Sequence, residues 1–491
     1  MATNRYIRGN IFALVFIILI FPLCSLVWAV AYYVDATGGN DSNSGLSEST
    51  SWKSVAKVNS SRFNPGDQIL FKRGAIWREQ LFVSSSGSSG NPITFGAYGS
   101  GNKPKLLGSV NLNGSSNWQL YSFNIWKSAS TISADVGNLI FNNESSCGKK
   151  KSSLTSMVSQ GDFYYDPSAK YLYVYSTSNP GTYYTVIEAA KRNNGVVISM
   201  RNYVTVQEFD IRYWGAHGIQ IDGYSGNCDN IIIQRNDISY IGGSYQFGTT
   251  RFGNGIEQWD NGTNLIVRYN RINQVYDAGM TTQGETPGNT KSDQLFYYNI
   301  VTNSEYGFEF FNRDATSRNT RIKIYNNVFY NNGGGWGHSQ RPDVSGIGFV
   351  MWGSTAISTS CQFQNNIIHT SAQNSINVDD ANDLLGWSID YNDLYPDGPI
   401  KFKIYTTHYD FTGWKTNSKQ DGHSITSNPL FVSTSDFHLQ STSPAINAGT
   451  NVGLTQDFDG NPISGVPDMG AFEFIGAPDN SPAAPQSLRI Q

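Results

Sequence analysis

Residues 265–272 read Leu-Ile-Val-Arg-Tyr-Asn-Arg-Ile, and this short pattern recurs along the chain. Each copy is an alternating apolar run, then an Asn, then another apolar residue. Four clear copies and two weaker ones place an Asn at the same point of the pattern, namely Asn236, Asn270, Asn299, Asn327, Asn366 and Asn392. Because the order of the pattern is kept while its spacing varies, it predicts structural repeats joined by loops of different length.

A second pattern precedes each copy, and it begins with Gly in residues 218–222, 255–259, 279–283, 307–311 and 346–350. Apolar and polar residues alternate after the Gly, which indicates a strand with one buried face. The first apolar residue of each copy is expected to point inward, giving an inner stack of Ile219, Ile256, Met280, Phe308 and Ile347. Residues 375–379 are a sixth copy that begins with Ser.

Two or three short strands per repeat cannot bury their apolar faces alone, but stacked coils can. An Asn at one turn of every coil could hydrogen-bond to the next coil, as polar ladders do in stacked structures. The sequence therefore predicts an all-β solenoid. A β-sandwich with Asn-rich turns is the alternative.

The composition limits the class of protein. Of 491 residues 13% are aromatic and only 15% charged, which excludes a disordered chain and a coiled coil. The net charge is −4 and no basic stripe is present, so nucleic acid is not expected as a partner. We expect a monomer.

The N-terminus has the features of an export signal, which we place at residues 1–31. Arg5 and Arg8 precede an apolar run, and Ala29-Val30-Ala31 forms a small-x-small cleavage site. No other long apolar run follows, so a secreted protein without a membrane segment is expected after cleavage. An uncleaved anchor is the alternative. The three remaining cysteines, Cys147, Cys228 and Cys361, allow at most one disulfide.

The coil pattern resembles the right-handed parallel β-helix of the pectate-lyase-like superfamily. Residues 32–45 and 65–79 resemble the opening of many secreted proteins of that kind. Residues 443–473 resemble the segment that closes many bacterial β-helices. The resemblance implies a parallel β-helix over residues 32–475 and a carbohydrate as substrate. It does not specify the reaction, because this superfamily holds lyases, hydrolases, epimerases and non-catalytic proteins.

Three segments depart from the coil pattern. Residues 51–58 predict a short helix that caps the first coil. Residues from about 110 to 195 are expected to form a β-rich insertion, with a hairpin over residues 163–175. Residues 476–491 are linker-like.

Strand alternation directs one set of acids away from the core. Glu257 and Glu309 occupy the same position two coils apart, which corresponds to about 9–10 Å between backbones. That separation suits two carboxyl groups that act as acid and base in glycoside hydrolysis. Asp222 lies diagonally from Glu257, and Asp277 precedes the strand between them, so we take these four acids as catalytic candidates. The alternative is that outward acids only keep an exposed sheet soluble.

Further candidates concern substrate binding. Trp259 and Phe311 share the outward strip and could cover apolar sugar faces. Loops near the strip carry other polar candidates: Lys291, Arg313, His338 and Arg341. In a polysaccharide lyase the basic residues among them would serve as base or neutralise a uronate.

The sequence thus favours a secreted enzyme that cleaves a polysaccharide, with paired carboxylates of a glycoside hydrolase preferred. A lyase or epimerase acting on a uronate polymer and a non-catalytic glycan-binding protein are the alternatives. No cofactor is required and no metal ligand is assigned, although calcium could bind among the outward acids.

Overall fold

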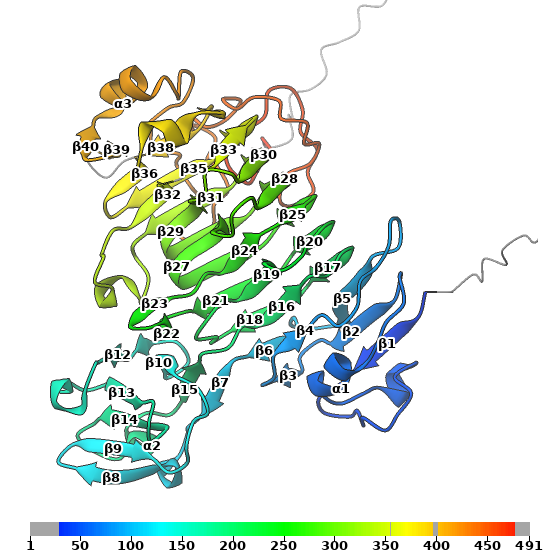
Figure 1. The fold of residues 1–491 in the computed structure, drawn as a ribbon, viewed down its shortest axis with the longest axis vertical. Coiled ribbons are helices and arrows are strands. Elements are labelled where there is room, and N and C mark those ends of the chain that lie inside the picture. Colours follow the sequence, from blue (N-terminus) through cyan, green and yellow to red (C-terminus); the bar gives the residue numbers. More distant parts are fainter. Residues whose placement is uncertain (1–28, 354, 396–400, 477–491) are drawn as a thin grey trace, which may run out of the picture.

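The computed structural model describes residues 29–353, 355–395 and 401–476, so most of the predicted signal peptide and tail lies outside the described residues. The chain is all-β, and its strands wind into coils that stack along the long axis of the molecule (Figure 1). Within the coils the neighbouring strands pair in parallel. The prediction of a parallel β-helix is confirmed.

One long sheet contains a strand from each successive coil. Its main strands are β1 (Ala31–Val34), β2 (Gln68–Lys72), β5 (Ile93–Tyr98), β17 (Val204–Gln207), β20 (Ile231–Gln234), β26 (Leu265–Arg268), β28 (Thr290–Tyr297), β30 (Arg318–Tyr325), β34 (Cys361–Gln364) and β37 (Trp387–Asp390). Two short strands, β25 (Gly262–Thr263) and β33 (Ile357–Thr359), pair with the first residues of β28 and β30. We call this whole sheet the rear sheet.

The other large sheet folds around a corner and has two columns of strands. The site column is β4 (Leu81–Phe82), β16 (Val196–Ser199), β19 (Ile219–Gly223), β24 (Ile256–Asp260), the second halves of β27 (Arg271–Gly284) and β29 (Ile300–Asn312), β32 (Ile347–Trp352), β36 (Asn374–Val378) and β39 (Phe402–Ile404). The side column is β3 (Ile76–Trp77), β6 (Lys105–Leu107), β18 (Asp210–Arg212), β21 (Asp237–Ile241), the first halves of β27 and β29, β31 (Val328–Asn332), β35 (Ile367–Ser371) and β38 (Asp393–Tyr395).

The predicted Asn ladder lies at the turn between the rear sheet and the side column. The backbone N–H and the side-chain amide of Asn270 both donate to Oδ1 of Asn299, at 3.1 and 3.0 Å. The same pair of bonds joins each of the six Asn to the next, from Asn236 to Asn392. The residue before each Asn has a positive φ, for example 57° at Tyr269, so the ladder fixes a costly turn.

The inner stack confirms four of the five predicted positions. Ile219, Ile256, Met280 and Phe308 pair in register and are fully buried. The prediction for Ile347 is wrong, because Phe349 pairs with Phe308 and joins the stack instead. The sequence copy that begins at Gly346 is out of register by two residues, and the matching glycine is Gly348. A Cβ at Gly255 would lie 2.4 Å from the carbonyl oxygen of Gly279, and a Cβ at Gly218 or Gly307 would meet the next coil in the same way, which explains the recurring glycine at this point of these coils.

Residues 109–191 leave the coil and form two mainly antiparallel sheets around a core of their own. One sheet is β7 (Ser109–Asn111), β15 (Ile187–Lys191), β10 (Val136–Phe141) and β11 (Ser146–Cys147). The other is β8 (Trp118–Ser122), β9 (Ile125–Ser128), β14 (Tyr171–Tyr175), β13 (Asp162–Asp166) and β12 (Lys149–Lys150). Figure 1 shows this insertion beside the first coils, next to a hairpin of β22 (Ser244–Phe247) and β23 (Thr250–Phe252).

Short helices lie near the ends of the solenoid, in the insertion and in the loop between β31 and β32. The α-helices are α1 (Val55–Ser60), α2 (Pro180–Tyr183) and α3 (Phe411–Ser418), and the 3₁₀ turns are Glu48–Thr50, Ser115–Asn117, Leu154–Ser156, His338–Gln340 and Ala381–Leu384. The buried Val55 and Val58 of α1 join the main core at the first coils, and Trp414 of α3 does so at the last coils. Strand β40 (Thr407–Tyr409) pairs with β39 before α3.

Candidate active site

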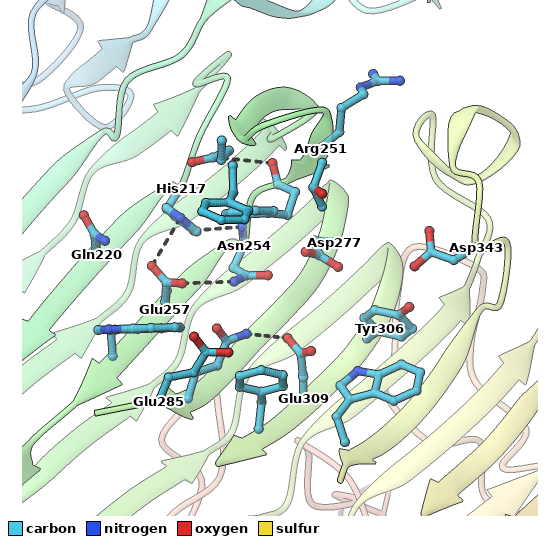
Figure 2. Close-up of a pocket in the computed structure, with 18 of the residues that line it drawn as sticks. His217, Gln220, Arg251, Asn254, Glu257, Asp277, Glu285, Tyr306, Glu309 and Asp343 are labelled. Atoms are coloured by element: carbon cyan, nitrogen blue, oxygen red, sulfur yellow. Dashed lines mark hydrogen bonds and ion pairs between the residues drawn. The ribbon is translucent and has the colours of Figure 1, made fainter. Parts of the chain in front are cut away.

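A pocket of about 1140 Å³ lies on the outer surface of the site column. The floor is formed by β19, β24, β27, β29 and β32, and loops from the hairpin β22–β23 and from residues 341–343 form the walls. All four predicted catalytic acids line it, together with Trp259, Phe311, Arg313 and Arg341. Figure 2 shows Glu257, Asp277 and Glu309 around the same space.

The floor follows the predicted strand register. Gln220, Glu257, Thr281 and Glu309 pair in one row, so Thr281 separates the two glutamates. The strip was expected to be an exposed sheet face, but Glu257 is only 4% exposed and Glu309 only 6%. The walls cover these acids, and their burial changes the chemistry of both.

Glu257 is held by a row of polar residues at the start of the site strands. The backbone N–H of Asn254 donates to Nδ1 of His217 at 3.1 Å, so the ring carries its proton on Nε2. That Nε2 lies 3.2 Å from Oε2 of Glu257. Burial lowers the pKa of His217 to about 3, so the imidazole is neutral. Burial raises the pKa of Glu257 to about 8, and hydrogen bonds from Gln220 and Asn254 oppose that rise.

Glu309 has a similar environment on β29. The side-chain amide of Gln283 donates to its Oε2 at 2.6 Å. Burial, followed by the nearby charge of Asp277, raises the pKa of Glu309 to about 8. Glu309 is therefore largely protonated at neutral pH and can give up a proton to a bound ligand.

Asp277 differs from both glutamates because it contacts a cation. Nη1 of Arg341 lies 3.0 Å from its Oδ1, and the Arg341 side chain is only 6% exposed. Burial raises the pKa of Asp277, while the guanidinium opposes this and favours the ionised form. Arg341 also contacts Asp343 at 2.9 Å and donates to the carbonyl of Tyr276. Burial thus raises the pKa of all three acids, and Asp277 differs in having a guanidinium in contact that opposes the rise.

The wall that carries Arg341 is fixed by a buried acid. Glu305 accepts bonds from the backbone N–H groups of Ser345 and Gly346, at 2.7 and 3.1 Å. Nδ1 of His338 lies 2.8 Å from its other oxygen. His338 does not line the pocket, so its predicted contact with substrate is replaced by a contact that supports the wall.

The insertion holds both walls in place. Arg251 of the hairpin donates to the carbonyl oxygens of Gly137 in the insertion and Gln340 in the opposite wall. The side-chain amide of Gln340 in turn donates to the carbonyl of Gly148 at 2.9 Å. The insertion therefore contributes to the shape of the pocket although its strands do not line the floor.

Aromatic rings and peripheral charges complete the lining. One row across the neighbouring strands carries three aromatic side chains, Trp259, Phe311 and Trp352. The guanidinium of Arg313 lies over the Phe311 ring, 4.6 Å from its centroid. Asp222 accepts bonds from Ser199 and from the backbone of Tyr224 near the edge of the pocket.

The prediction that Lys291 binds substrate is wrong. Its side chain is 1% exposed and lies inside the coil, where Nζ donates to the carbonyl of Gln283 and to Oδ1 of Asn289. Lys291 belongs to a strand rather than a loop, and strand alternation turns it away from the pocket.

Sequence reasoning missed several lining residues, among them Tyr306, Asn254 and Trp352. Correct alignment of the β32 copy would have placed Trp352 beside Phe311. In the part of the chain that the structure describes, no group of three or more acidic, His or Cys side chains is arranged to hold a metal ion. Over the same ranges, no helix is long and apolar enough to cross a membrane.

Comparison with known proteins gives a partial sequence match and a match in fold. No family model matches the chain. A lacto-N-biosidase of Bifidobacterium longum subsp. longum is 35% identical over 112 residues, which is 21% of this chain and 7% of that protein. The chain thus spans a small part of that relative.

Solved structures resemble the chain over a longer range. The complex of XylC with xylose aligns with a TM-score of 0.50 at 12% identity, covering 76% of this chain and 66% of that one. The GH136 lacto-N-biosidase from Eubacterium ramulus gives a TM-score of 0.46 at 16% identity, covering 75% and 56%. The strand pairings above, together with the likeness to the XylC complex, show that the chain folds as a parallel β-helix.

Proposed function

We propose that this protein is a glycoside hydrolase, with Glu309 as general acid and Asp277 as the ionised carboxylate. The observation that carries the proposal is that one pocket holds Asp277, which contacts a guanidinium, beside Glu309, which is buried and accepts a hydrogen bond from an uncharged amide. Hydrolysis of a glycosidic bond needs such a pair. Glu309 retains its proton because it is buried, while Arg341 contacts Asp277 and favours its charge.

The two groups divide the reaction between them. Glu309 transfers its proton to the glycosidic oxygen as the bond to the anomeric carbon breaks. Asp277 either attacks that carbon or takes a proton from the water that does so. Glu257 and Glu309 are less suited to act as a pair, because burial keeps both protonated in the same pH range. Glu257 then serves to hydrogen-bond a sugar hydroxyl.

The basic residues give less support to a lyase. Lys291 points into the coil, Arg341 is bound by two carboxylates, and Arg313 is stacked on Phe311. None of them is placed as a free base over the floor of the pocket. The aromatic row beside the acids suits stacking with sugar rings.

The comparisons also support a carbohydrate substrate. The curated relative is named a lacto-N-biosidase, and the aligned XylC structure is a complex with xylose. We further propose that residues 1–31 direct export, so that the substrate is an extracellular glycan.

The test is a screen of glycans that measures new reducing ends and the absorbance of unsaturated uronates. We expect reducing ends without that absorbance. On the glycan identified, Asp277→Asn and Glu309→Gln should each lower kcat by at least about 10²–10⁴-fold, the usual contribution of a general acid or base. Asp293→Asn on the rear sheet is the matched control and should retain activity, because Asp293 forms an ion pair with Arg321 there and does not line the pocket.

Each other outcome contradicts a defined part of the proposal. The appearance of unsaturated uronates would identify a lyase. Binding of a glycan without any cleavage would identify a binding protein. Near-native turnover by both variants would show that Asp277 and Glu309 are not the acting pair.

A further inference from the structure

A second cavity, of about 350 Å³, lies beside the pocket near the insertion. It is lined by Gln80, Arg192, Asn193, Asn194, Ala216 and Gln246. Five of these six side chains are polar, none is acidic and none is aromatic. Ligand sites measure about 300–1,000 Å³, so this volume is at the small end of the range and suits one sugar unit.

Several of the lining groups are available for hydrogen bonds. Within residues 29–353, 355–395 and 401–476, the side-chain amides of Gln80 and Asn193 make no hydrogen bond. Arg192 uses Nη2 to bind the carbonyl oxygen of Gln246 at 2.8 Å, which leaves its other N–H groups free. Amides and a guanidinium together offer donors and acceptors of the kind that sugar hydroxyls need.

The cavity adjoins the catalytic pocket. Gln246 of the hairpin lines both spaces. The backbone N–H of His217 donates to Oδ1 of Asn194, and the backbone N–H of Ala278 donates to Oδ1 of Asn254, both at 3.0 Å. One row of polar groups therefore runs from this cavity towards Asp277.

The cavity is also connected to Glu257. The amide of Asn194 donates to Oε1 of Gln220 at 2.5 Å, and this orients the amide nitrogen of Gln220 towards Glu257. A sugar hydroxyl bound against Asn194 therefore lies next to Gln220, and Gln220 in turn hydrogen-bonds Glu257.

We propose that this cavity is an additional sugar subsite, which binds a hydroxyl-rich unit adjacent to the unit held over the acids. The inference rests on the proposed glycosidase function and specifies its substrate as an oligosaccharide chain rather than a single glycoside. The chain would run along the polar row, from Asp277 past Glu257 to Arg192 and Asn193.

The test compares oligosaccharides of increasing length with the linkage that the glycan screen identifies. We expect kcat/KM to rise on the order of 10-fold at the length that first reaches the cavity, the contribution of one or two hydrogen bonds that include a charged donor. The double variant Arg192→Ala/Asn193→Ala should lose this step. The readout is the ratio of kcat/KM for the longer and shorter substrates, so a general loss of activity cancels.

Arg321→Ala on the rear sheet is the matched control and should keep the wild-type ratio. The subsite is contradicted if wild-type kcat/KM shows no step with length, or if the double variant retains the step. Failure of the proposed function is seen separately, because no oligosaccharide of any length would then be hydrolysed. In that case the subsite is also rejected.

Discussion

Replacing Arg341 with Met tests whether this guanidinium assigns the roles of the acids. Arg341 is the cation in contact with Asp277, at 3.0 Å, and both side chains are largely buried. Without it, burial and the neighbouring acids raise the pKa of Asp277 further, because the ionised form loses its partner. At neutral pH a smaller fraction of the enzyme then holds an ionised Asp277.

The magnitude follows from the geometry. Unit charges about 4 Å apart attract by about 4 kcal/mol at an effective dielectric constant of about 20. Since each 1.36 kcal/mol corresponds to a factor of ten, kcat/KM at neutral pH should fall by up to about 10³-fold. The acid limb of the pH profile should move to higher pH, so part of the loss is recovered in alkaline buffer.

The assay is the pH profile of kcat/KM on the identified glycan. Arg341→Lys keeps the charge and should shift the acid limb less than Arg341→Met. Arg313→Met removes a pocket cation that contacts Phe311 rather than Asp277, so it should leave the limb in place. Thermal unfolding checks that each variant is folded. An acid limb that stays in place in Arg341→Met, with a uniform loss at every pH, would refute the electrostatic role.

Three further predictions concern stability. Phe308→Ala should lower the free energy of unfolding by about 3–5 kcal/mol in urea titrations, because the ring is fully buried, and a loss below about 1 kcal/mol would contradict the inner stack. Asn299→Ala should cost about 1–3 kcal/mol for each buried group left unpaired, and differential scanning calorimetry should show a larger loss than for the exposed Asn264→Ala. Burial raises the pKa of Glu257 and Glu309 to about 8, so the folded state binds more protons than the unfolded state between about pH 4.5 and 8. The free energy of unfolding should therefore fall as pH rises through that range, and the fall should be smaller in Glu309→Gln; an unchanged pH dependence in that variant would contradict the raised pKa.

Most of the fold could be predicted because it depends on local patterns. The period-two alternation gives the inward residues of β19, β24, β27 and β29, and the recurring Asn marks one turn of each coil. The prediction failed at β32, where a second glycine two residues before the correct one suggested the wrong register.

The floor of the site could be predicted for the same reason, but its cover could not. Alternation places Glu257 and Glu309 on the outer surface, whatever lies above them. The contact between Arg341 and Asp277 joins residues 64 positions apart, and it depends on the path of a loop that has no repeating pattern. The raised pKa of each glutamate also comes from the walls, so it has no signal in the strand sequence.

The Asn ladder has a direction. In every rung the coil nearer the N-terminus donates and the coil nearer the C-terminus accepts, so the amide dipoles are aligned along the solenoid. Like the peptide groups of an α-helix, they add to a macrodipole whose positive end lies at Asn392. There the side-chain amide of Asn392 donates to Oδ1 of Asp421 at 3.4 Å, much as an acidic residue caps a helix N-terminus. Each rung presents the same amide donor and the same carbonyl acceptor, so one coil could be duplicated or removed without changing the hydrogen bonds of the ladder. Asp421, in contrast, can cap only the final coil.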